Sequence, residues 1–435
     1  MPRWRIRVLV VAIFLVGAGL RLHHLTDYPE RNSTADEYAW TWSGMSLVNQ
    51  GVPRAWSWMP AYGDVPVSTW HGNEYRLVKP WFDHPPLYPL YVGAFMRAAG
   101  MRQIFYVQER VMRLSNMPLF AAAFFLLFLV ARRVADETHA LLTLAWWSVA
   151  PVAVWNGRLV MAEQLMLPLA LAGWYALQRY GDAERASQRR AWLVAVAIAA
   201  MLLPLAKIAA LGFALFLFAA AVLRRQWKLA AAVCVGGGAG LLVWLGYGAH
   251  YGWTLFRAVQ ENQASRFDNF GGFYAMVFTP RVVSKALMEL PLVLGFVTLL
   301  FDLREGRHVE MALFAASYAM TIAFMLPYNE YGWYAIPLYP AMAFGVASFV
   351  VRAWRDVSTG ALWTWVLFSV TWLAWIGCDA GVLKPHRLRW WYLALVVALP
   401  IYTAATVKRP RLWRAVFVGL VTLQGLGEAV YSFRR

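Results

Sequence analysis

The sequence predicts an all-α protein that crosses a membrane many times. Of its 435 residues, 60% are hydrophobic and only 14% are charged, whereas about 25% of residues in soluble domains are charged. The mean hydropathy is +0.48. A water-soluble fold of this size could not bury so much apolar surface, so we expect lipid to solvate most of it. Two further observations support this class: apolar runs of membrane-spanning length, and basic clusters between them.

About thirteen apolar runs approach the roughly 20 residues that a helix needs to span the hydrocarbon core. They lie near residues 6–22, 114–131, 138–156, 160–178, 191–205, 208–223, 229–248, 284–301, 310–327, 334–351, 361–378, 391–407 and 415–432. The fifth and sixth runs are short and meet at Lys207, so they form either two helices or one long tilted helix. This choice decides on which side of the membrane the C-terminus lies.

Basic residues fall in short clusters between these runs, at residues 3–7, 132–133, 224–228 and 408–414. The net charge of +17 would suggest nucleic acid in a soluble protein, but such clusters are typical of cytoplasmic loops. With a cytoplasmic N-terminus all four lie inside, and we expect no nucleic-acid partner. Lys384, Arg387 and Arg389 fall outside in this topology, which indicates either an anionic ligand there or a span count wrong by one.

The first run follows three arginines and contains Gly17-Ala18-Gly19, which is also typical of a cleaved signal peptide. We expect an uncleaved first helix, because the chain needs a membrane anchor. Residues 1–435 are then one transmembrane domain in the inner (plasma) membrane, with no separate soluble C-terminal domain. Cys234 and Cys378 lie in apolar runs, so no structural disulfide is expected.

Residues 23–113 are predicted to form the first extracytoplasmic loop, which is too long for a simple connector. Six tryptophans in this loop suit a membrane interface. A helix is expected over residues 36–50, after Asn32-Ser33-Thr34 and before Gly51. A second is expected over residues 87–99, after Pro85-Pro86 and before Gly100. Both should lie on the membrane surface rather than cross it.

Two acidic sites bracket this loop, Asp36-Glu37 and Asp83 beside His84. Ionisable groups close to lipid are costly and usually serve a site. The alternative for Asp36 and Glu37 is that they only favour the positive end of the helix they begin. Spacing alone leaves both interpretations open.

Three further charged residues, Arg158, Glu163 and Lys207, lie near the same face in the predicted topology. An ion pair between Arg158 and Glu163 is one explanation for that pair. Lys207 has no partner nearby in the sequence, so an anionic ligand is favoured there. The segment 261–272, which contains Arg266, is either a lid or an ordinary polar loop. The glycines at 236, 237, 238 and 240 are expected to allow close helix packing.

These residues also carry a family resemblance. Asp36-Glu37 after the first helix, Pro-Pro-Leu-Tyr at 85–88 and Tyr-Ala-Ile-Pro-Leu-Tyr-Pro at 334–340 resemble motifs of the GT-C glycosyltransferase superfamily. Arg-Leu-Ser-Asn at 113–116 and Ala-Pro at 150–151 add to the pattern. The chain is most similar to bacterial lipid A aminoarabinose transferases and protein O-mannosyltransferases. Order and spacing carry the resemblance, which covers most of residues 1–350.

The resemblance implies a sugar donor linked to a polyprenyl phosphate, of the undecaprenyl-phosphate type, and transfer on the extracytoplasmic face. It implies Asp36 as the catalytic base, with Glu37 supporting it and Asp83 in the second acidic position. His84 stands where relatives commonly have Lys, so phosphate binding there requires a protonated imidazole. The acceptor would be the hydroxyl or phosphate of a glycan, a lipid or a protein.

The chemistry suits these residue types independently of the family. Transfer from a lipid phosphate breaks a C1–O bond through an oxocarbenium-like transition state. A carboxylate can take the acceptor's proton, and cations stabilise the departing phosphate. We expect inversion, with Lys207, Arg158 and Arg266 as phosphate-binding candidates in that order. Glu163, Tyr331 and Tyr334 are candidates for the donor or acceptor pocket.

No cofactor is expected to be required. As an alternative, Asp36, Glu37 and Asp83 offer the hard oxygen ligands that Mg²⁺ or Mn²⁺ prefers, although the most similar relatives generally work without a metal. Two alternative functions predict other patterns. A transporter or lipid flippase would show paired repeats with broken helices at the midplane, and none is visible. A polysaccharide polymerase or ligase would place its large loop late in the chain, whereas here it comes first.

Overall fold

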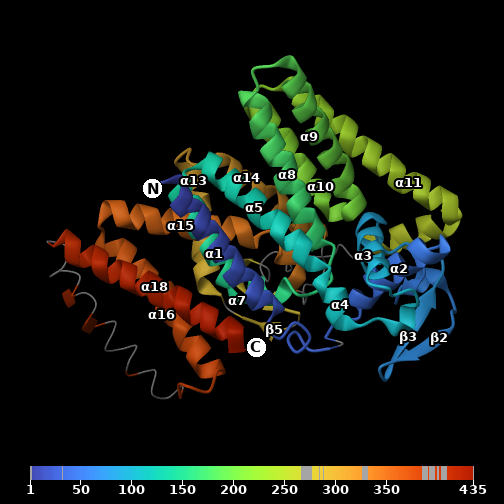
Figure 1. Ribbon diagram of the computed structural model, residues 1–435, viewed down its shortest axis with the longest axis horizontal. Coiled ribbons are helices and arrows are strands. Elements are labelled where there is room, and N and C mark those ends of the chain that lie inside the picture. Colours follow the sequence, from blue (N-terminus) through green and yellow to red (C-terminus); the bar gives the residue numbers. More distant parts are fainter. Residues whose placement is uncertain are drawn as a thin grey trace.

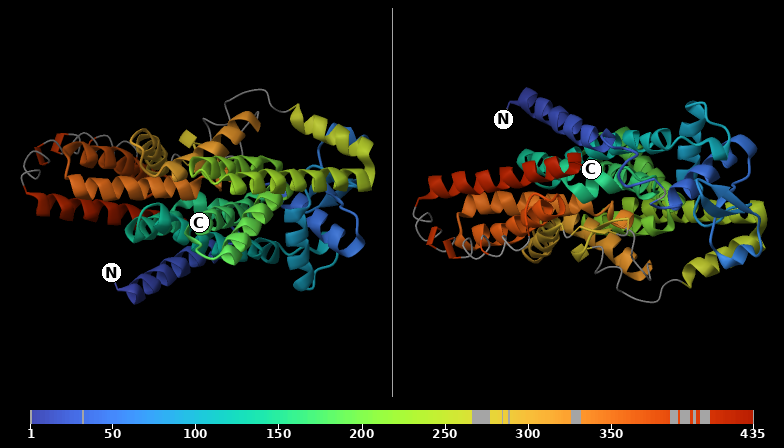
Figure 2. Two further views of the ribbon diagram at one scale, coloured as in Figure 1. Left: turned by 90° about the horizontal axis from the view of Figure 1, so that it is seen from above. Right: turned by 90° about the horizontal axis from the view of Figure 1, so that it is seen from below.

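The computed structural model is a bundle of tilted helices, with the first long loop folded at one end (Figures 1 and 2). It describes residues 2–31, 33–265, 277–283, 285–287, 289–325, 332–384, 390, 397–398, 401–402 and 409–434. The long helices are α1 (Arg3–Leu22), α5 (Asn116–Val134), α6 (Glu137–Val149), α8 (Glu163–Asp182), α9 (Ala186–Ala206), α10 (Leu211–Leu223), α11 (Trp227–Ala264), α13 (Leu290–Arg304), α14 (Val309–Met325), α15 (Tyr339–Asp356), α16 (Thr359–Asp379) and α18 (Pro410–Arg434).

These helices cover every predicted apolar run except 391–407, most of which lies outside the described residues. Among the described residues, five helices are each long and apolar enough to cross a membrane by length and composition. They are Glu109–Val134, Ala186–Ala206, Trp227–Ala264, Gly360–Asp379 and Pro410–Arg434. The helical membrane architecture is therefore confirmed, whereas the number of thirteen spans stays a prediction.

The fifth and sixth runs are two separate helices. α9 ends at Ala206, and Lys207 has an extended backbone with φ −165° and ψ 142°. The short helix η3 (Ile208–Ala210) then leads into α10. Lys207 therefore lies at a break between two helices rather than on the face of a single one.

The glycine-rich stretch of α11 packs against α9, as expected for two of its four glycines. A Cβ atom on Gly236 would lie 2.2 Å from the carbonyl oxygen of Ala197, and one on Gly240 would lie 2.2 Å from that of Met201. Gly237 and Gly238 have nothing within 4 Å of such an atom. Close packing thus explains positions 236 and 240 only.

The run predicted at 138–156 is not one helix, because Pro151 interrupts it. α6 ends at Val149 and α7 (Pro151–Asn156) follows. Proline has no N–H, so it cannot bond the carbonyl of Trp147. The buried Arg21 of α1 instead donates to the carbonyl oxygens of Trp147 and Ser148, both at 3.3 Å. These two hydrogen bonds satisfy carbonyl groups that the break in the helix leaves without a backbone partner. They also position the turn that carries Arg158.

The first loop contains the two predicted helices, α2 (Asp36–Gln50) and α3 (Leu87–Ala98). Their backbones touch at two glycines: a Cβ on Gly44 would lie 1.9 Å from the carbonyl oxygen of Pro89, and one on Gly93 would lie 2.2 Å from that of Gly44. The loop is completed by η1 (Pro60–Tyr62), η2 (Ile104–Tyr106) and α4 (Glu109–Leu114).

A small antiparallel sheet also lies in this loop, which the purely helical prediction missed. Its strands are β1 (Ala55–Trp56), β2 (Val67–Trp70) and β3 (Asn73–Val78), in the order β1-β3-β2. A second pair, β4 (Arg281–Val282) and β5 (Lys285–Ala286), precedes α13, and η4 (Gly332–Ala335) precedes α15.

α11 reaches the first loop and bends there (Figure 1). The bend is at Gly252, whose φ of 142° is outside the helical region and is readily adopted only by glycine. The following residues, 253–264, form an arm of α11 that lies against η1. Phe256 and Val259 of this arm pack with Phe82 and Trp244 in a small hydrophobic cluster.

Candidate active site

A cavity of about 90 Å³ lies where the start of α2, the residues before α3, the arm of α11 and η4 meet. Two carboxylates, an imidazole, an amide and several aromatic rings line it: Asp36, Ala39, Trp40, Trp56, Trp58, Met59, Trp81, Asp83, His84, Gln263 and Tyr334. The structure therefore brings Asp36, Asp83, His84 and Tyr334 together, although more than 200 residues separate the first and the last.

Glu37 does not line this cavity and is instead held in a buried ion pair. Its two carboxylate oxygens accept hydrogen bonds from Nε and Nη2 of Arg113 at 3.0 and 2.8 Å. The backbone N–H of Val160 also donates to Glu37, at 3.0 Å. The side chains of Arg113 and Glu37 are only 2% and 3% exposed. Glu37 thus fixes the first turn of α2 to α4 and to the turn before α8, and so positions its neighbour Asp36.

Asp83 is held by a residue that the sequence analysis did not single out. The hydroxyl of Tyr62 donates to Oδ1 of Asp83 at 2.8 Å and accepts from the backbone N–H of Phe82 at 2.7 Å. Burial, and then the charge of Asp83, raise the pKa of Tyr62 well above its usual value. The hydroxyl therefore stays protonated and remains a donor to the carboxylate.

The arm of α11 holds the backbone at the same place. The side-chain amide of Gln260 donates to the carbonyl oxygen of Phe82 at 2.9 Å, and that of Gln263 donates to the carbonyl oxygen of Asp83 at 3.0 Å. The backbone N–H of Ala61 donates to Oδ1 of Asn262 at 3.2 Å. The position of Asp83 is thus set by both η1 and the arm.

His84 packs among tryptophan rings. Its ring stacks on Trp40 with centroids 4.4 Å apart and planes 10° apart, and it meets the edge of Trp81 at 5.7 Å. The imidazole is therefore oriented by aromatic contacts, and it can supply positive charge to the cavity when it is protonated.

Lys207 has a partner that is distant in the sequence. Its Nζ lies 2.5 Å from Oε1 of Glu163 and 4.3 Å from the centre of the Tyr334 ring. Lys207 thus contacts the cavity through Tyr334 while it is paired with a fully buried carboxylate. The other carboxylate oxygen of Glu163 is buried and accepts no hydrogen bond within the described part of the chain.

The ion pair considered between Arg158 and Glu163 is not formed, because Glu163 pairs with Lys207. Arg158 is 1% exposed and donates to the backbone carbonyl oxygens of Tyr28 at 2.5 Å and Leu20 at 2.8 Å. It joins the end of α1 to the turn after α7, and it is not among the described residues that line the cavity. Arg266 and Tyr331 lie outside the described residues, as do Arg387, Arg389 and most of the segment 261–272.

The described residues include no group of three His, Cys, Asp or Glu side chains placed to hold a metal ion. Asp36 and Asp83 are the two carboxylates that a divalent ion in the cavity would meet. The expectation that no metal is required stays a prediction.

Residues 83–247 match the family described as dolichyl-phosphate-mannose-protein mannosyltransferase. A sequence search of curated proteins finds no significant match.

Two solved structures are similar over nearly the whole chain. ArnT from Cupriavidus metallidurans, solved bound to undecaprenyl phosphate, superposes with a TM-score of 0.60 at 14% identity, over 98% of this chain and 75% of that one. The Archaeoglobus fulgidus oligosaccharyltransferase in its apo form gives 0.56 at 12% identity, over 99% of this chain and 56% of that one. This chain therefore spans little more than half of the archaeal protein. The chain thus shares the fold of these two membrane proteins over nearly its whole length, and residues 83–247 are similar to the mannosyltransferase family, as the resemblance to the GT-C superfamily predicts.

Proposed function

We propose that this chain is a GT-C glycosyltransferase that moves one hexosyl or pentosyl unit from a polyprenyl phosphate to an acceptor on the extracytoplasmic face of the inner membrane. The observation that carries the proposal is the shared cavity of Asp36 and Asp83, with Lys207 in contact with its Tyr334 wall. The description of the matched family names a dolichyl-phosphate sugar, and the structure of ArnT was solved with bound undecaprenyl phosphate. Both support a lipid-phosphate donor.

Asp36 is the proposed base. It begins α2 and lines the cavity, while the adjacent Glu37 is immobilised by Arg113. In the proposed step Asp36 takes the proton of the acceptor hydroxyl as the acceptor oxygen bonds to C1 of the sugar. The bond from C1 to the phosphate oxygen breaks, and its electron pair leaves with the lipid phosphate. Base and leaving group then lie on opposite faces of the sugar, which inverts C1.

The departing phosphate gains negative charge, which fixed cations stabilise. His84 lines the cavity itself, and Lys207 lies behind Tyr334. Because Lys207 is already paired with Glu163, a donor phosphate would share this cation with a carboxylate. The tryptophan walls would exclude water and pack against the sugar ring. An extracytoplasmic glycan, lipid or protein supplies the acceptor.

The experiment that tests this proposal compares Asp36→Asn with Asp64→Asn in purified protein in lipid vesicles. Transfer of a labelled sugar from a polyprenyl phosphate to an extracted cell-envelope acceptor is measured. We expect Asp36→Asn to lower turnover by roughly 10²- to 10⁴-fold, the usual contribution of a general base. Asp64 is an exposed residue of the same loop, so its variant should match the wild type. Undiminished turnover of Asp36→Asn would remove the proposed base.

A further inference from the structure

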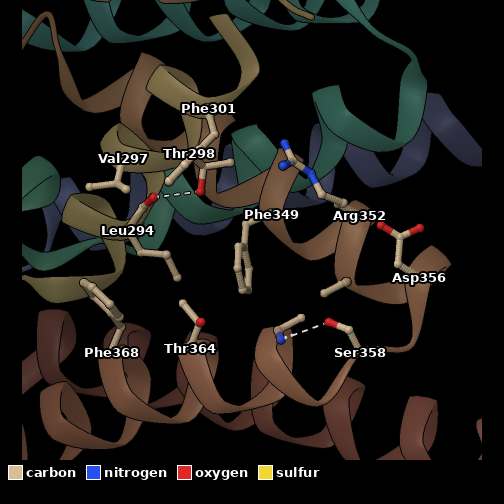
Figure 3. Close-up of a pocket in the computed structure, with 12 residues that line it drawn as sticks. Leu294, Val297, Thr298, Phe301, Phe349, Arg352, Asp356, Ser358, Thr364 and Phe368 are labelled. Atoms are coloured by element: carbon tan, nitrogen blue, oxygen red, sulfur yellow. Dashed lines mark hydrogen bonds between the residues drawn. The ribbon is translucent and has the colours of Figure 1, made fainter. Parts of the chain in front are cut away.

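α13 has a buried acidic residue near each of its ends. Near the C-terminal end, Asp302 pairs with Arg352, which lines a cavity of about 260 Å³ between α13, α15 and α16 (Figure 3). At the other end, Glu289 directly precedes the first residue of α13, and its side chain is fully buried. Within the described part of the chain, Asp302 thus has a basic partner, whereas no cation acts on the carboxylate of Glu289.

The carboxylate of Glu289 holds the start of α7 with one of its two oxygens. Oε2 accepts a hydrogen bond from the backbone N–H of Val152 at 2.9 Å. Val152 lies in the first turn of α7, where backbone N–H groups have no partner within the helix. The other oxygen, Oε1, is buried and has no hydrogen-bond partner among the described residues. Glu289 thus leaves one oxygen without a donor in a place that excludes solvent.

Glu428 of α18 has the same arrangement. Its side chain is fully buried, and Oε1 accepts from Nε2 of Gln424 at 2.9 Å and from the indole N–H of Trp372 at 3.1 Å. Oε2 is buried and accepts no hydrogen bond from the residues that the structure describes. No cation in that part of the chain acts on this carboxylate either. Each glutamate therefore uses one oxygen and leaves the other without a donor.

The packing of α18 against α7 brings the two glutamates together. The hydroxyl of Ser432 donates to the carbonyl oxygen of Val149, just before α7, at 2.8 Å. Glu428 precedes Ser432 by four residues and so lies on the same face of α18. Glu428 therefore faces the start of α7, where Glu289 binds Val152. The charge of Glu428 acts directly on that of Glu289.

Two ionised carboxylates in this position would be costly, because like charges repel each other strongly where water is excluded. When two carboxyl groups share such a site, one of them keeps its proton. A protonated carboxyl has one O–H donor, which fits two glutamates with one unbonded oxygen each, whereas a divalent cation takes about six oxygen ligands. The hydroxyl of Tyr339, on α15, also lies near Glu289 but donates to the carbonyl oxygen of Gly332 at 3.1 Å. A single proton therefore matches the oxygens that the site offers.

We propose that Glu289 and Glu428 share one proton, held between Oε1 of Glu289 and Oε2 of Glu428. One residue then donates its O–H to the other, and a hydrogen bond to a charged oxygen is of the strong kind. This bond joins α18 to the start of both α7 and α13. The proton takes no part in the proposed transfer reaction. Because the folded chain holds a proton that ionised glutamates of the unfolded chain lack, the free energy of unfolding should decrease as the pH rises above neutrality.

Infrared difference spectroscopy of the full chain in lipid vesicles at pH 7 tests the shared proton directly, because a protonated carboxyl has a C=O band that a carboxylate lacks. Glu289→Gln and Glu428→Gln are made singly. The amide of either variant can donate to the remaining carboxylate, so each variant should lose the whole band. Glu310→Gln is the matched control and should keep the band. Glu310 also accepts from an indole N–H, that of Trp174 at 2.9 Å, but it pairs with Arg224.

Thermal unfolding in detergent from pH 7 to 9 gives the second measurement. The wild type and Glu310→Gln should unfold at lower temperatures as the pH rises, and the two single variants should lose less of their melting temperature over the same range. The proposal would be overturned by a wild type without the carboxyl band, or by single variants that each keep part of it, since the two protons would then be independent. An equal pH dependence of the wild type and the single variants would overturn it as well. If one variant does not fold, the other variant and the wild-type band still decide the outcome.

Discussion

The hydroxyl of Tyr62 donates to Oδ1 of Asp83 at 2.8 Å while it accepts from the backbone N–H of Phe82 at 2.7 Å. The side chain of Tyr62 thus links the carboxylate of Asp83 to the backbone of the preceding residue, Phe82. Since Tyr62 lies in η1 and Asp83 before α3, this contact also fixes two separate parts of the first loop relative to each other.

Tyr62→Phe should therefore lower activity while leaving the fold intact. A hydrogen bond to a charged group is worth about 1.5–3 kcal/mol, which corresponds to roughly a 10- to 150-fold loss in kcat/KM. Tyr251→Phe is the matched control, because its hydroxyl donates to the carbonyl oxygen of Gly51 at 2.6 Å rather than to a carboxylate. Sugar transfer in lipid vesicles measures both variants, and a Tyr62→Phe variant as active as Tyr251→Phe would contradict this role.

The buried ion pair of Arg113 and Glu37 predicts that removing one partner destabilises the protein more than removing both charges. Arg113→Met alone leaves Glu37 buried without its cation and should destabilise the protein by about 3–5 kcal/mol. The double variant Arg113→Met with Glu37→Gln should recover much of this loss, because Gln can still accept from the N–H of Val160. Thermal unfolding in detergent measures both. A double variant as unstable as the single one would show that the ion pair is not the source of the loss.

The roles of Lys207 and Glu163 can be distinguished by the kinetics of two single variants. If Lys207 binds the donor phosphate, Lys207→Ala should raise the KM for the donor by at least about tenfold. Glu163→Gln removes the competing carboxylate, so it should leave that KM unchanged or lower it. A purely structural pair would instead give the same loss of stability and the same kinetics in both variants.

His84 lines the cavity and is a candidate to bind the donor phosphate. His84→Gln keeps a polar side chain but cannot carry a positive charge, so it should weaken donor binding by roughly tenfold, the loss of a charge-assisted hydrogen bond of about 1.5 kcal/mol. His84→Lys supplies a permanent positive charge and should bind the donor at least as tightly as the wild type. Donor titrations of the three proteins at one pH provide the measurement. Equal affinities of the wild type and His84→Gln would exclude His84 from phosphate binding.

Much of the fold could be predicted because the length of an apolar run, and the residues that begin and end a helix, are local features of the sequence. The polar residues before α2, the prolines before α3 and the glycines after both lie next to those helices, and both helices form. The N-cap of α2 is Ala35, without a side-chain cap, rather than one of the polar residues before it, and α3 ends at Ala98, one residue earlier than predicted. The short sheet was missed because strands as brief as Ala55–Trp56 leave no periodic pattern. The break at Pro151 carried a local signal, but the apolar run on both sides concealed it.

The site was predictable in part. Asp36 and Asp83 stood out because carboxylates near lipid are unusual, and the structure places both in one cavity. The ion pair of Lys207 with Glu163 joins residues 44 apart, and the contact of Tyr62 with Asp83 depends on the path of an irregular segment. Such contacts depend on tertiary packing, which no local pattern encodes.

The two glycines where α2 meets α3 have a consequence beyond packing. Asp36 begins α2, and Asp83 comes just before α3, so the backbone contact at Gly44 and Gly93 sets how far apart the two acidic groups stand. A methyl group at either glycine would push the two helices apart and so change the distance between Asp36 and Asp83, although neither glycine lines their cavity.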